Sequence, residues 1–258
     1  MQIEKVFIQS TKGNLAAVIH YPETPTDKLA ILCPGFLDSK DYLGLVGLAE
    51  ELAKIGYTTV RFDPTGTWDS EGDISEYDNT QYLEDVKNVL EYMLKQGDFQ
   101  QVLLGGHSRG GMLSILYAAR DQRITLILGI MPSSKRTMVG QRYQDWKAAG
   151  VSISHRDLPE DSTQKREFRV PFSHVIDREQ YDVIQDVGKV LVPVILVAGE
   201  LDRLVLPEHV QEIYKHANEP KKFIIIPGIS HDYRHREQEV RIVNEQILEH
   251  LKLLVKNN

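Results

Sequence analysis

The sequence is poor in cysteine and has no long hydrophobic run. Cys33 is the only cysteine among 258 residues, so no disulfide can form within the chain. The longest apolar runs, near residues 124–131 and 190–197, are much shorter than the roughly 20 residues that span a bilayer. The first ten residues lack the basic flank and apolar core of a signal peptide. We therefore expect a cytoplasmic protein with no membrane anchor.

The chain has fewer basic than acidic residues. It contains 30 Lys and Arg and 37 Asp and Glu, which gives a formal net charge of -7. Nucleic-acid binding draws most of its affinity from basic side chains that neutralise phosphates, so this balance disfavours a nucleic-acid partner. The share of hydrophobic residues, 41%, is enough for one sizeable globular core.

Motifs for metals and nucleotides are also missing. The stretch HDYRH places His231 and His235 one helical turn apart beside Asp232, but neither H-E-x-x-H, nor paired C-x-x-C, nor a further ligand cluster accompanies it. The glycines around Ser108 lack the lysine of G-x-x-x-x-G-K and the spacing of G-x-G-x-x-G. We expect neither a metal nor a cofactor.

Short β-branched runs alternate with segments of helical period. Apolar residues repeat at helical spacing over residues 45–55, 83–93 and 240–254. Strand-like runs occupy residues 6–10, 15–21, 29–35, 57–63, 101–106, 124–130, 192–199 and 222–228. The short TKGN link between the first two runs suits an antiparallel hairpin at the sheet edge. This pattern predicts an α/β fold with a mostly parallel eight-stranded sheet flanked by helices.

Residues 132–188 interrupt this alternation. The segment is charged, carries aromatic residues, and has no run long enough for another buried strand. So long a break between two strand–helix units is more often a functional lid than an unstructured loop, although its charges leave a disordered surface excursion as the alternative. We predict a core of residues 1–132 and 189–258, with a cap of residues 133–188.

The stretch GHSRG, residues 106–110, matches G-x-S-x-G between a predicted strand and a predicted helix. The serine then occupies a tight turn, where the residues two positions before and after it must be small. Gly106 and Gly110 meet that requirement. The N-terminus of the helix also directs its amides toward charge that develops beside Ser108. We predict that Ser108 is a nucleophile.

A serine nucleophile needs a base and a third group that orients the base. Asp202 in GELDRLVLP and His231 in PGISH each follow a predicted strand, at the sheet edge where ligand sites of α/β folds form. The chain order Ser, Asp, His is the order of this type of fold. Glu200 is the nearest rival of Asp202, and His107 lies inside the turn itself. We predict a catalytic triad of Ser108, Asp202 and His231.

The oxyanion hole needs a second backbone N–H besides the one that follows the nucleophile. In LCPGFLDSK, Gly35 lets the backbone turn closely past a reacting carbonyl. We predict that the N–H groups of Phe36 and Arg109 are the two donors. Cys33 lies in an apolar strand with no base beside it, and we interpret it as structural.

The motifs together resemble those of the α/β-hydrolase superfamily over nearly the whole chain. They occur in the order PGF, FDPTGTWDSEG, GHSRGG, GELDRLVLP and PGISH. The chain is most similar to small-cap cinnamoyl or feruloyl esterases in length, triad spacing and insertion position, and REFRVPFSHVI resembles their cap. The resemblance implies hydrolysis of carboxylic esters through an acyl-enzyme, with Ser108, Asp202 and His231 as the triad and the Phe36 and Arg109 amides as the oxyanion hole.

The chain departs from that family at three places. Pro-Gly at residues 34–35 replaces the usual His-Gly, so polar support from that histidine is absent. Trp68 interrupts a glycine pattern; its indole either fills the acyl or alcohol side of the pocket or packs beneath the oxyanion loop. Arg109 is either solvated or salt-bridged at the start of a helix, or it reaches an acidic group in the cap. Together with Trp146 and Phe172, Trp68 is a candidate for the substrate pocket.

The prediction is a serine carboxylesterase that acts on a small-molecule ester, with the aromatic insertion favouring aryl or hydroxycinnamoyl groups. The same triad would serve a thioester, a peptide or a peracid. A catalytically idle binding protein on the same fold is the alternative from another class. The sequence is compatible with a monomer and with a homodimer.

Overall fold

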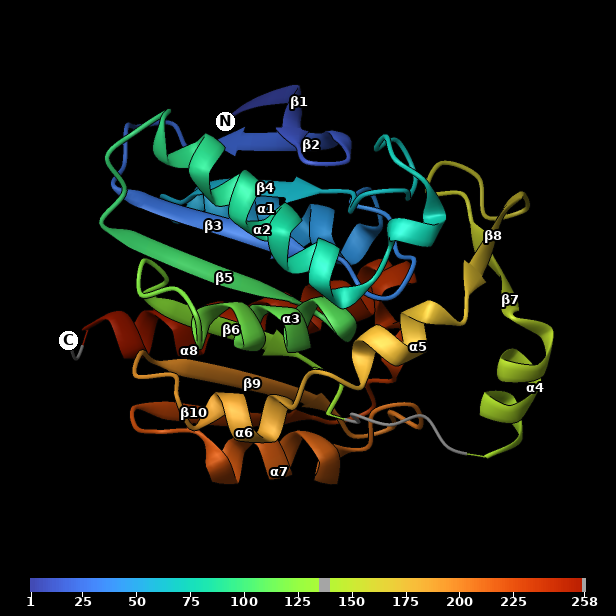
Figure 1. The fold of residues 1–258 in the computed structure, drawn as a ribbon. Helices are drawn as coiled ribbons and strands as arrows, with labels where there is room; N and C mark the ends of the chain where they lie inside the picture. The colour runs from blue at the N-terminus through green and yellow to red at the C-terminus, as the bar shows by residue number, and fades with distance from the viewer. Residues whose placement is uncertain (135–139, 257–258) are drawn as a thin grey trace.

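The computed structural model describes residues 1–134 and 140–256, and within them eight strands form one sheet (Figure 1). Across the sheet the order is β1-β2-β4-β3-β5-β6-β9-β10. The two pairs β1–β2 and β2–β4 are antiparallel and the other neighbours are parallel. The bounds are β1 Gln2–Ser10, β2 Gly13–Tyr21, β3 Lys28–Cys33, β4 Thr58–Phe62, β5 Gln101–His107, β6 Leu126–Ile130, β9 Val194–Gly199 and β10 Lys221–Ile226. The predicted mostly parallel sheet with a hairpin at its edge is confirmed.

Helices cover both faces of the sheet (Figure 1). One face carries α2 (Asn79–Leu94), α3 (Arg109–Ala118), α6 (Val183–Val187) and α7 (Pro207–His216), and the other carries α1 (Leu43–Lys54) and α8 (Glu237–Lys256). Alternate residues of β3 divide between the two layers: Ile31 packs in the core beneath α2 and α3, and Leu32 in the core beneath α1 and α8. A strand buried on both faces in this way reads as a continuous apolar run.

The insertion between β6 and β9 is folded in its described part. It contains α4 (Gln141–Ala149), β7 (Val151–Asp157), β8 (Lys165–Pro171), α5 (Ser173–Arg178) and then α6. β7 and β8 form an antiparallel hairpin separate from the main sheet. Trp146 Nε1 donates to Val170 O at 3.0 Å, so α4 is fixed to this hairpin. The hairpin is largely exposed, which is why no buried-strand pattern marks it in the sequence.

Parallel pairing brings the C-terminal ends of β3, β5, β9 and β10 to one edge of the sheet. The part of the insertion from α4 to α5, called the cap below, lies beyond that edge (Figure 1). The loops that leave these strand ends therefore face the cap. Among the described residues, no helix combines the length and the apolar character that a membrane span requires.

Candidate active site

Ser108 occupies the turn between β5 and α3. Its backbone φ of 54° lies in the left-handed region, a conformation that costs a non-glycine residue roughly 1–3 kcal/mol. The glycines two positions away permit the turn, because a Cβ on Gly106 or Gly110 would come within 2.3 Å or 2.1 Å of Cys33 O. The backbone of β3 therefore closes one side of the turn, and Ser108 lines a cavity on the other.

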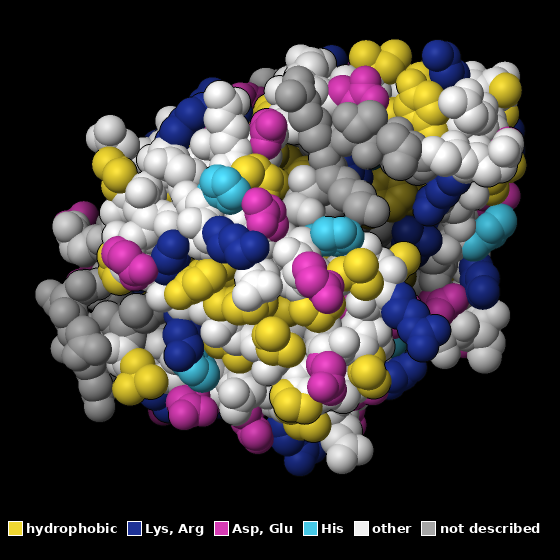
Figure 2. Space-filling model, turned by 90° about the horizontal axis from the view of Figure 1, so that it is seen from below, with side chains coloured by type: hydrophobic (Ala, Val, Ile, Leu, Met, Phe, Trp, Pro, Cys, Tyr) yellow, Lys and Arg dark blue, Asp and Glu magenta, His cyan; other side chains and the backbone are white. Residues whose placement is uncertain are grey.

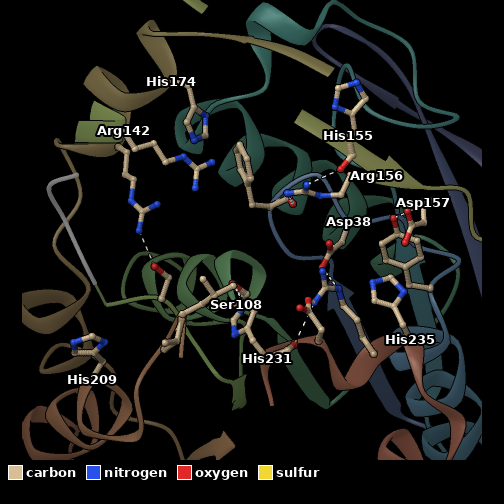
Figure 3. A pocket seen from close by; sticks show the side chains of 18 of the residues that line it. Asp38, Ser108, Arg142, His155, Arg156, Asp157, His174, His209, His231 and His235 are labelled. Atoms are coloured by element: carbon tan, nitrogen blue, oxygen red, sulfur yellow. Dashed lines mark hydrogen bonds and ion pairs between the residues drawn. The ribbon is translucent and has the colours of Figure 1, made fainter. Parts of the chain in front are cut away.

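The structure joins Ser108, His231 and Asp202 in one chain of hydrogen bonds, of which Figure 3 labels Ser108 and His231. His231 Nε2 lies 3.0 Å from Ser108 Oγ, and His231 Nδ1 lies 2.6 Å from Asp202 Oδ2. When Nδ1–H donates to the carboxylate, Nε2 is left as the acceptor that faces the serine hydroxyl. The three side chains that the sequence predicts as a triad are thus brought together in the order that proton transfer requires.

Asp202 is held in place by the loop that follows β9. Its Oδ1 accepts hydrogen bonds from Leu204 N and Val205 N, each at 2.8 Å. Burial would raise the pKa of Asp202, but the hydrogen bond and charge of His231 and the two backbone N–H groups outweigh it, so the pKa lies below its ordinary value. The rival carboxylate, Glu200, instead accepts from Gly228 N at 2.9 Å. Asp202 is therefore the carboxylate that meets the histidine.

The loop after β3 turns close to the nucleophile. Asp38 N donates to Gly35 O at 3.1 Å, and Leu37 N donates to Tyr77 Oη at 2.9 Å. Within the described residues, neither Phe36 N nor Arg109 N donates to another backbone group. The two N–H groups that the sequence predicts as oxyanion donors thus have no backbone acceptor among the described residues, and their role stays a prediction.

A buried ion pair connects this loop with the loop that carries His231. Asp38 Oδ2 lies 2.9 Å from Arg234 Nε, and Arg234 Nη1 donates to His231 O at 3.2 Å. Burial would raise the pKa of Asp38, but the charge of Arg234, together with the neighbouring His107, holds it well below its usual range. Sequence reasoning missed this pair, although Asp38 lies two residues after the PGF motif and Arg234 lies in HDYRH.

His107 packs beneath the candidate base. Its ring centroid lies 4.6 Å from that of His231, and burial lowers the pKa of His107 to about 4. His107 is therefore neutral near pH 7, and it adds no positive charge beside His231. The sequence likewise predicts His107 inside the turn and not as a member of the triad.

A cavity of about 800 Å³ opens above Ser108. Ser108 and His231 lie on one side of it, and side chains of α4, α5 and β7 form the opposite wall (Figure 3). Of the three aromatic residues predicted for the substrate pocket, Trp146 lines this cavity. The ring of Trp146 stacks on that of His174, with the two planes 11° apart. Flat aromatic surface is thus part of the cap wall.

The predictions for Trp68 and Phe172 need correction, because neither residue is part of the cavity lining. Trp68 Nε1 donates to Leu37 O at 3.1 Å, and its ring meets that of Tyr42 edge-on at 5.7 Å. The indole therefore packs against the oxyanion loop, which is the second of its two interpretations. Phe172 precedes α5 and its ring contacts that of Tyr143 at 5.4 Å, inside the cap.

Both interpretations of the Arg109 side chain are also wrong. Only 3% of the residue is exposed. Its Nε donates to Asn79 Oδ1 at 2.9 Å, and its guanidinium carbon lies 4.2 Å from the ring centroid of Tyr77. The side chain is thus neither solvated nor, within the described part of the chain, paired with a carboxylate of the cap. It lies behind the oxyanion loop on the Tyr77 hydroxyphenyl ring that fixes Leu37.

The histidines of HDYRH are used in packing and in the triad geometry. The ring of His235 meets that of Tyr42 edge-on at 4.6 Å, and Asp232 pairs with Arg234 at 2.7 Å. In residues 1–134 and 140–256, no three His, Cys, Asp or Glu side chains form a group that could hold a metal ion.

Comparisons with known proteins identify the fold. Residues 29–149 match the family model described as the alpha/beta hydrolase fold. The structure is similar to that of Est1E from Butyrivibrio proteoclasticus with ferulic acid bound, with a TM-score of 0.79 and 23% sequence identity over 97% of this chain and 99% of the other. The chain therefore has the α/β-hydrolase fold, as its motifs predict.

Two curated relatives are similar to this chain at low sequence identity. The Escherichia coli "uncharacterized 31.7 kDa protein in traX-finO intergenic region" is 26% identical over 72% of this chain and 76% of the relative. The mouse "palmitoyl-protein thioesterase ABHD10, mitochondrial" is 24% identical over 68% of this chain and 59% of the relative.

Proposed function

From the α/β-hydrolase fold of the chain we propose that it is a serine hydrolase that cleaves carboxylic esters through an acyl-enzyme on Ser108. The observation that carries this proposal is the continuous hydrogen-bonded contact from Ser108 Oγ through His231 to Asp202. A buried carboxylate that orients a histidine beside a strained serine is the arrangement that activates a hydroxyl for nucleophilic attack.

In the proposed reaction Ser108 Oγ attacks the ester carbonyl carbon while His231 Nε2 takes the hydroxyl proton. The negative oxygen of the tetrahedral intermediate accepts hydrogen bonds from Phe36 N and Arg109 N; the loss of one such donor costs roughly 100- to 1,000-fold in rate. His231 then gives the proton to the leaving alcohol. Water, deprotonated by the same histidine, attacks the acyl carbon, and His231 returns that proton to Ser108 Oγ as the acid leaves.

An acyl group with aromatic character is the finer part of the proposal. Trp146 and His174 stack on each other in the cap wall of the cavity, and stacked rings favour a flat aromatic ligand beside them. A protein of the same fold was solved with ferulic acid bound. Methyl ferulate and other hydroxycinnamoyl esters are therefore the first substrates to compare with simple alkyl esters.

A thioester is the second candidate substrate, and the name of the mouse relative favours it. The proposed chemistry is unchanged, because the same nucleophile, base and oxyanion donors act on the carbonyl carbon whether the leaving atom is oxygen or sulfur. The two substrates differ only in how readily the leaving group departs and in what the cavity accepts.

The test is covalent labelling followed by substrate comparison. A fluorophosphonate should label the wild-type protein and fail to label Ser108→Ala, and p-nitrophenyl butyrate hydrolysis should fall to background in that variant. Ser114→Ala is the matched control, since Ser114 is buried in α3 outside the cavity lining, where its Oγ donates to Gly110 O of the same helix. Full ester hydrolysis by Ser108→Ala, or no labelling of wild type, would overturn the proposal.

A further inference from the structure

The lining of the cavity has the opposite charge balance to the chain as a whole. The chain carries a formal charge of -7, yet Lys and Arg outnumber Asp and Glu among the described lining residues. The cationic ones are Arg142, Arg156, Lys165, Arg178, Arg234 and Arg236, and the acidic ones are Asp38, Asp157 and Asp232. Figure 2 shows dark blue Lys and Arg side chains recurring along its right-hand side, the end of the molecule where α4, β7 and β8 lie in Figure 1.

Some of these cations are neutralised by carboxylates of the chain. Arg234 pairs with Asp38 and Asp232, at 2.9 Å and 2.7 Å. Arg236 pairs with Glu239 at 2.6 Å, and Lys165 lies 3.7 Å from Asp157. These residues add little net charge to the cavity, and the remaining cations of its lining are arginines of the cap.

Arg156 on β7 is the first of these arginines. Its Nη1 donates to His155 O at 3.0 Å and its Nη2 to Phe36 O at 3.2 Å, both of which are neutral carbonyl groups. Its Nε is buried and has no hydrogen-bond partner among the described residues. A buried donor that is left unpaired is costly unless a ligand completes it. Among the described residues Arg156 therefore has no carboxylate within ion-pair distance, although its charge contributes to the lowered pKa of Asp38.

Arg142 and Arg178 add to the same wall. Arg142, at the start of α4, is exposed and, within the described ranges, makes no ion pair or hydrogen bond. Arg178 Nη2 donates to Ser133 Oγ at 2.7 Å; burial, together with the charge of Arg109, lowers the pKa of Arg178 to about 10, so it remains charged at neutral pH. In Figure 3 the labelled Arg142 and Arg156 lie on the cap side of the cavity, across from Ser108 and His231.

We propose that this wall is an anion subsite and that the substrate is an ester or thioester that also bears a carboxylate or phosphate group. Guanidinium groups match both anions with paired N–H donors, and a concave site lined by one sign of charge concentrates ligands of the opposite sign. This inference rests on the proposed function, since it assigns a substrate class to the Ser108 site. A purely solvated role for these arginines would leave the buried Nε of Arg156 unexplained.

Two pairs of substrates separate the anion from the rest of the molecule. 4-Nitrophenyl hydrogen glutarate and 4-nitrophenyl butyrate have similar acyl chains, but only the first has a free carboxylate. Butyryl-coenzyme A and the butyryl thioester of N-acetylcysteamine share the reacting thioester, but only the first has phosphates. A higher kcat/KM for the anionic member of the first pair identifies a carboxylate site. A higher kcat/KM for the anionic member of the second pair identifies a phosphate site.

The variants Arg142→Gln, Arg156→Gln and their combination test whether the wall is responsible. For the preferred pair, the ratio of anionic to neutral kcat/KM should fall about tenfold for each arginine whose charged hydrogen bond to the ligand is lost. Arg169→Gln is the matched control, because Arg169 lies in the same hairpin, pairs with Glu167 and is not part of the lining. It should leave the ratio unchanged.

The outcomes distinguish this inference from the proposed function. A preference for an anionic substrate that the double variant loses and the Arg169→Gln control keeps supports the anion subsite. Hydrolysis of the neutral substrates with no anionic preference in either pair, or a preference that survives in the double variant, overturns it while the hydrolase proposal stands. No hydrolysis of any of the four substrates and no labelling of Ser108 overturns both.

Discussion

Replacement of Asp202 by asparagine should invert the roles of the two His231 ring nitrogens. Asp202 Oδ1 accepts two backbone N–H groups, from Leu204 and Val205 at 2.8 Å. In Asp202→Asn these two donors require an oxygen at that position, so the amide oxygen takes it and the amide NH2 is turned toward His231 Nδ1. Since NH2 is a donor, Nδ1 must become the acceptor and the proton moves to Nε2.

The consequence is a base that cannot accept the proton of Ser108. His231 Nε2 lies 3.0 Å from Ser108 Oγ, and with a hydrogen on that nitrogen it faces the hydroxyl as a donor. Loss of the correct tautomer in a triad of this kind lowers kcat by about 10,000-fold. We expect a fall of that order in kcat for p-nitrophenyl butyrate with little change in KM, because Asp202 does not line the cavity.

The assay needs a control for the charge that the substitution removes. Glu200→Gln removes a neighbouring carboxylate, and its amide oxygen can keep the bond from Gly228 N, so its kcat should stay within about twofold of wild type because a surface substitution of this kind perturbs little. Circular dichroism and a denaturant titration establish that both variants are folded. Asp202→Asn activity within tenfold of wild type, or an equal loss in Glu200→Gln, would refute the reasoning.

Two further predictions concern the loop that carries Phe36 N, the proposed oxyanion donor. Tyr77→Phe keeps the ring but removes the acceptor of Leu37 N. The unpaired buried N–H should lower the free energy of unfolding by about 1–3 kcal/mol, which a denaturant titration measures. In steady-state kinetics kcat should fall while KM changes less. Asp38→Asn breaks the buried pair with Arg234 and should cost about 3–5 kcal/mol near pH 7. The pKa of Asp38 is depressed in the folded state. Its contribution to stability is therefore complete above the unfolded pKa of about 3.9 and is lost as the pH falls further, so the difference in stability between Asp38→Asn and wild type should shrink in acid. A difference that stays constant from pH 7 to pH 3 would contradict the ion pair.

The sequence predicts the sheet, and the position of Ser108, Asp202 and His231 at its edge, because both follow from periodicity. Alternating strand and helix segments place successive strand ends at one edge. Ser108, Asp202 and His231 each follow a strand within a few residues, so little chain separates a predictable element from the predicted side chain. Two glycines around Ser108 add a local requirement that is readable without knowledge of the neighbours.

The pocket residues could not be predicted in the same way, since their directions depend on contacts made across the fold. Trp68 lies in an irregular stretch after β4 and is turned by its bond to Leu37 O, a group 31 residues away. Arg109 begins a helix, and its burial depends on Asn79 and Tyr77, which come from a separate segment. No local period encodes such pairs, because they form only once the sheet has brought the segments together.

The ion pair of Asp38 and Arg234 connects the loop after β3 with the loop that carries His231. Asp38 follows the loop that carries Phe36 N, and Arg234 bonds to the carbonyl of His231, so one ion pair connects the proposed oxyanion donor with the proposed base. The distance between these two groups must be held closely, because a displacement of about 1 Å at a reacting centre can cost roughly 100-fold in rate. A buried pair that is already desolvated keeps its geometry better than a solvated one, although desolvation makes it a poor source of net stability. Its value to this fold is thus geometric, and Asp38→Asn should lower kcat by more than its effect on KM would explain.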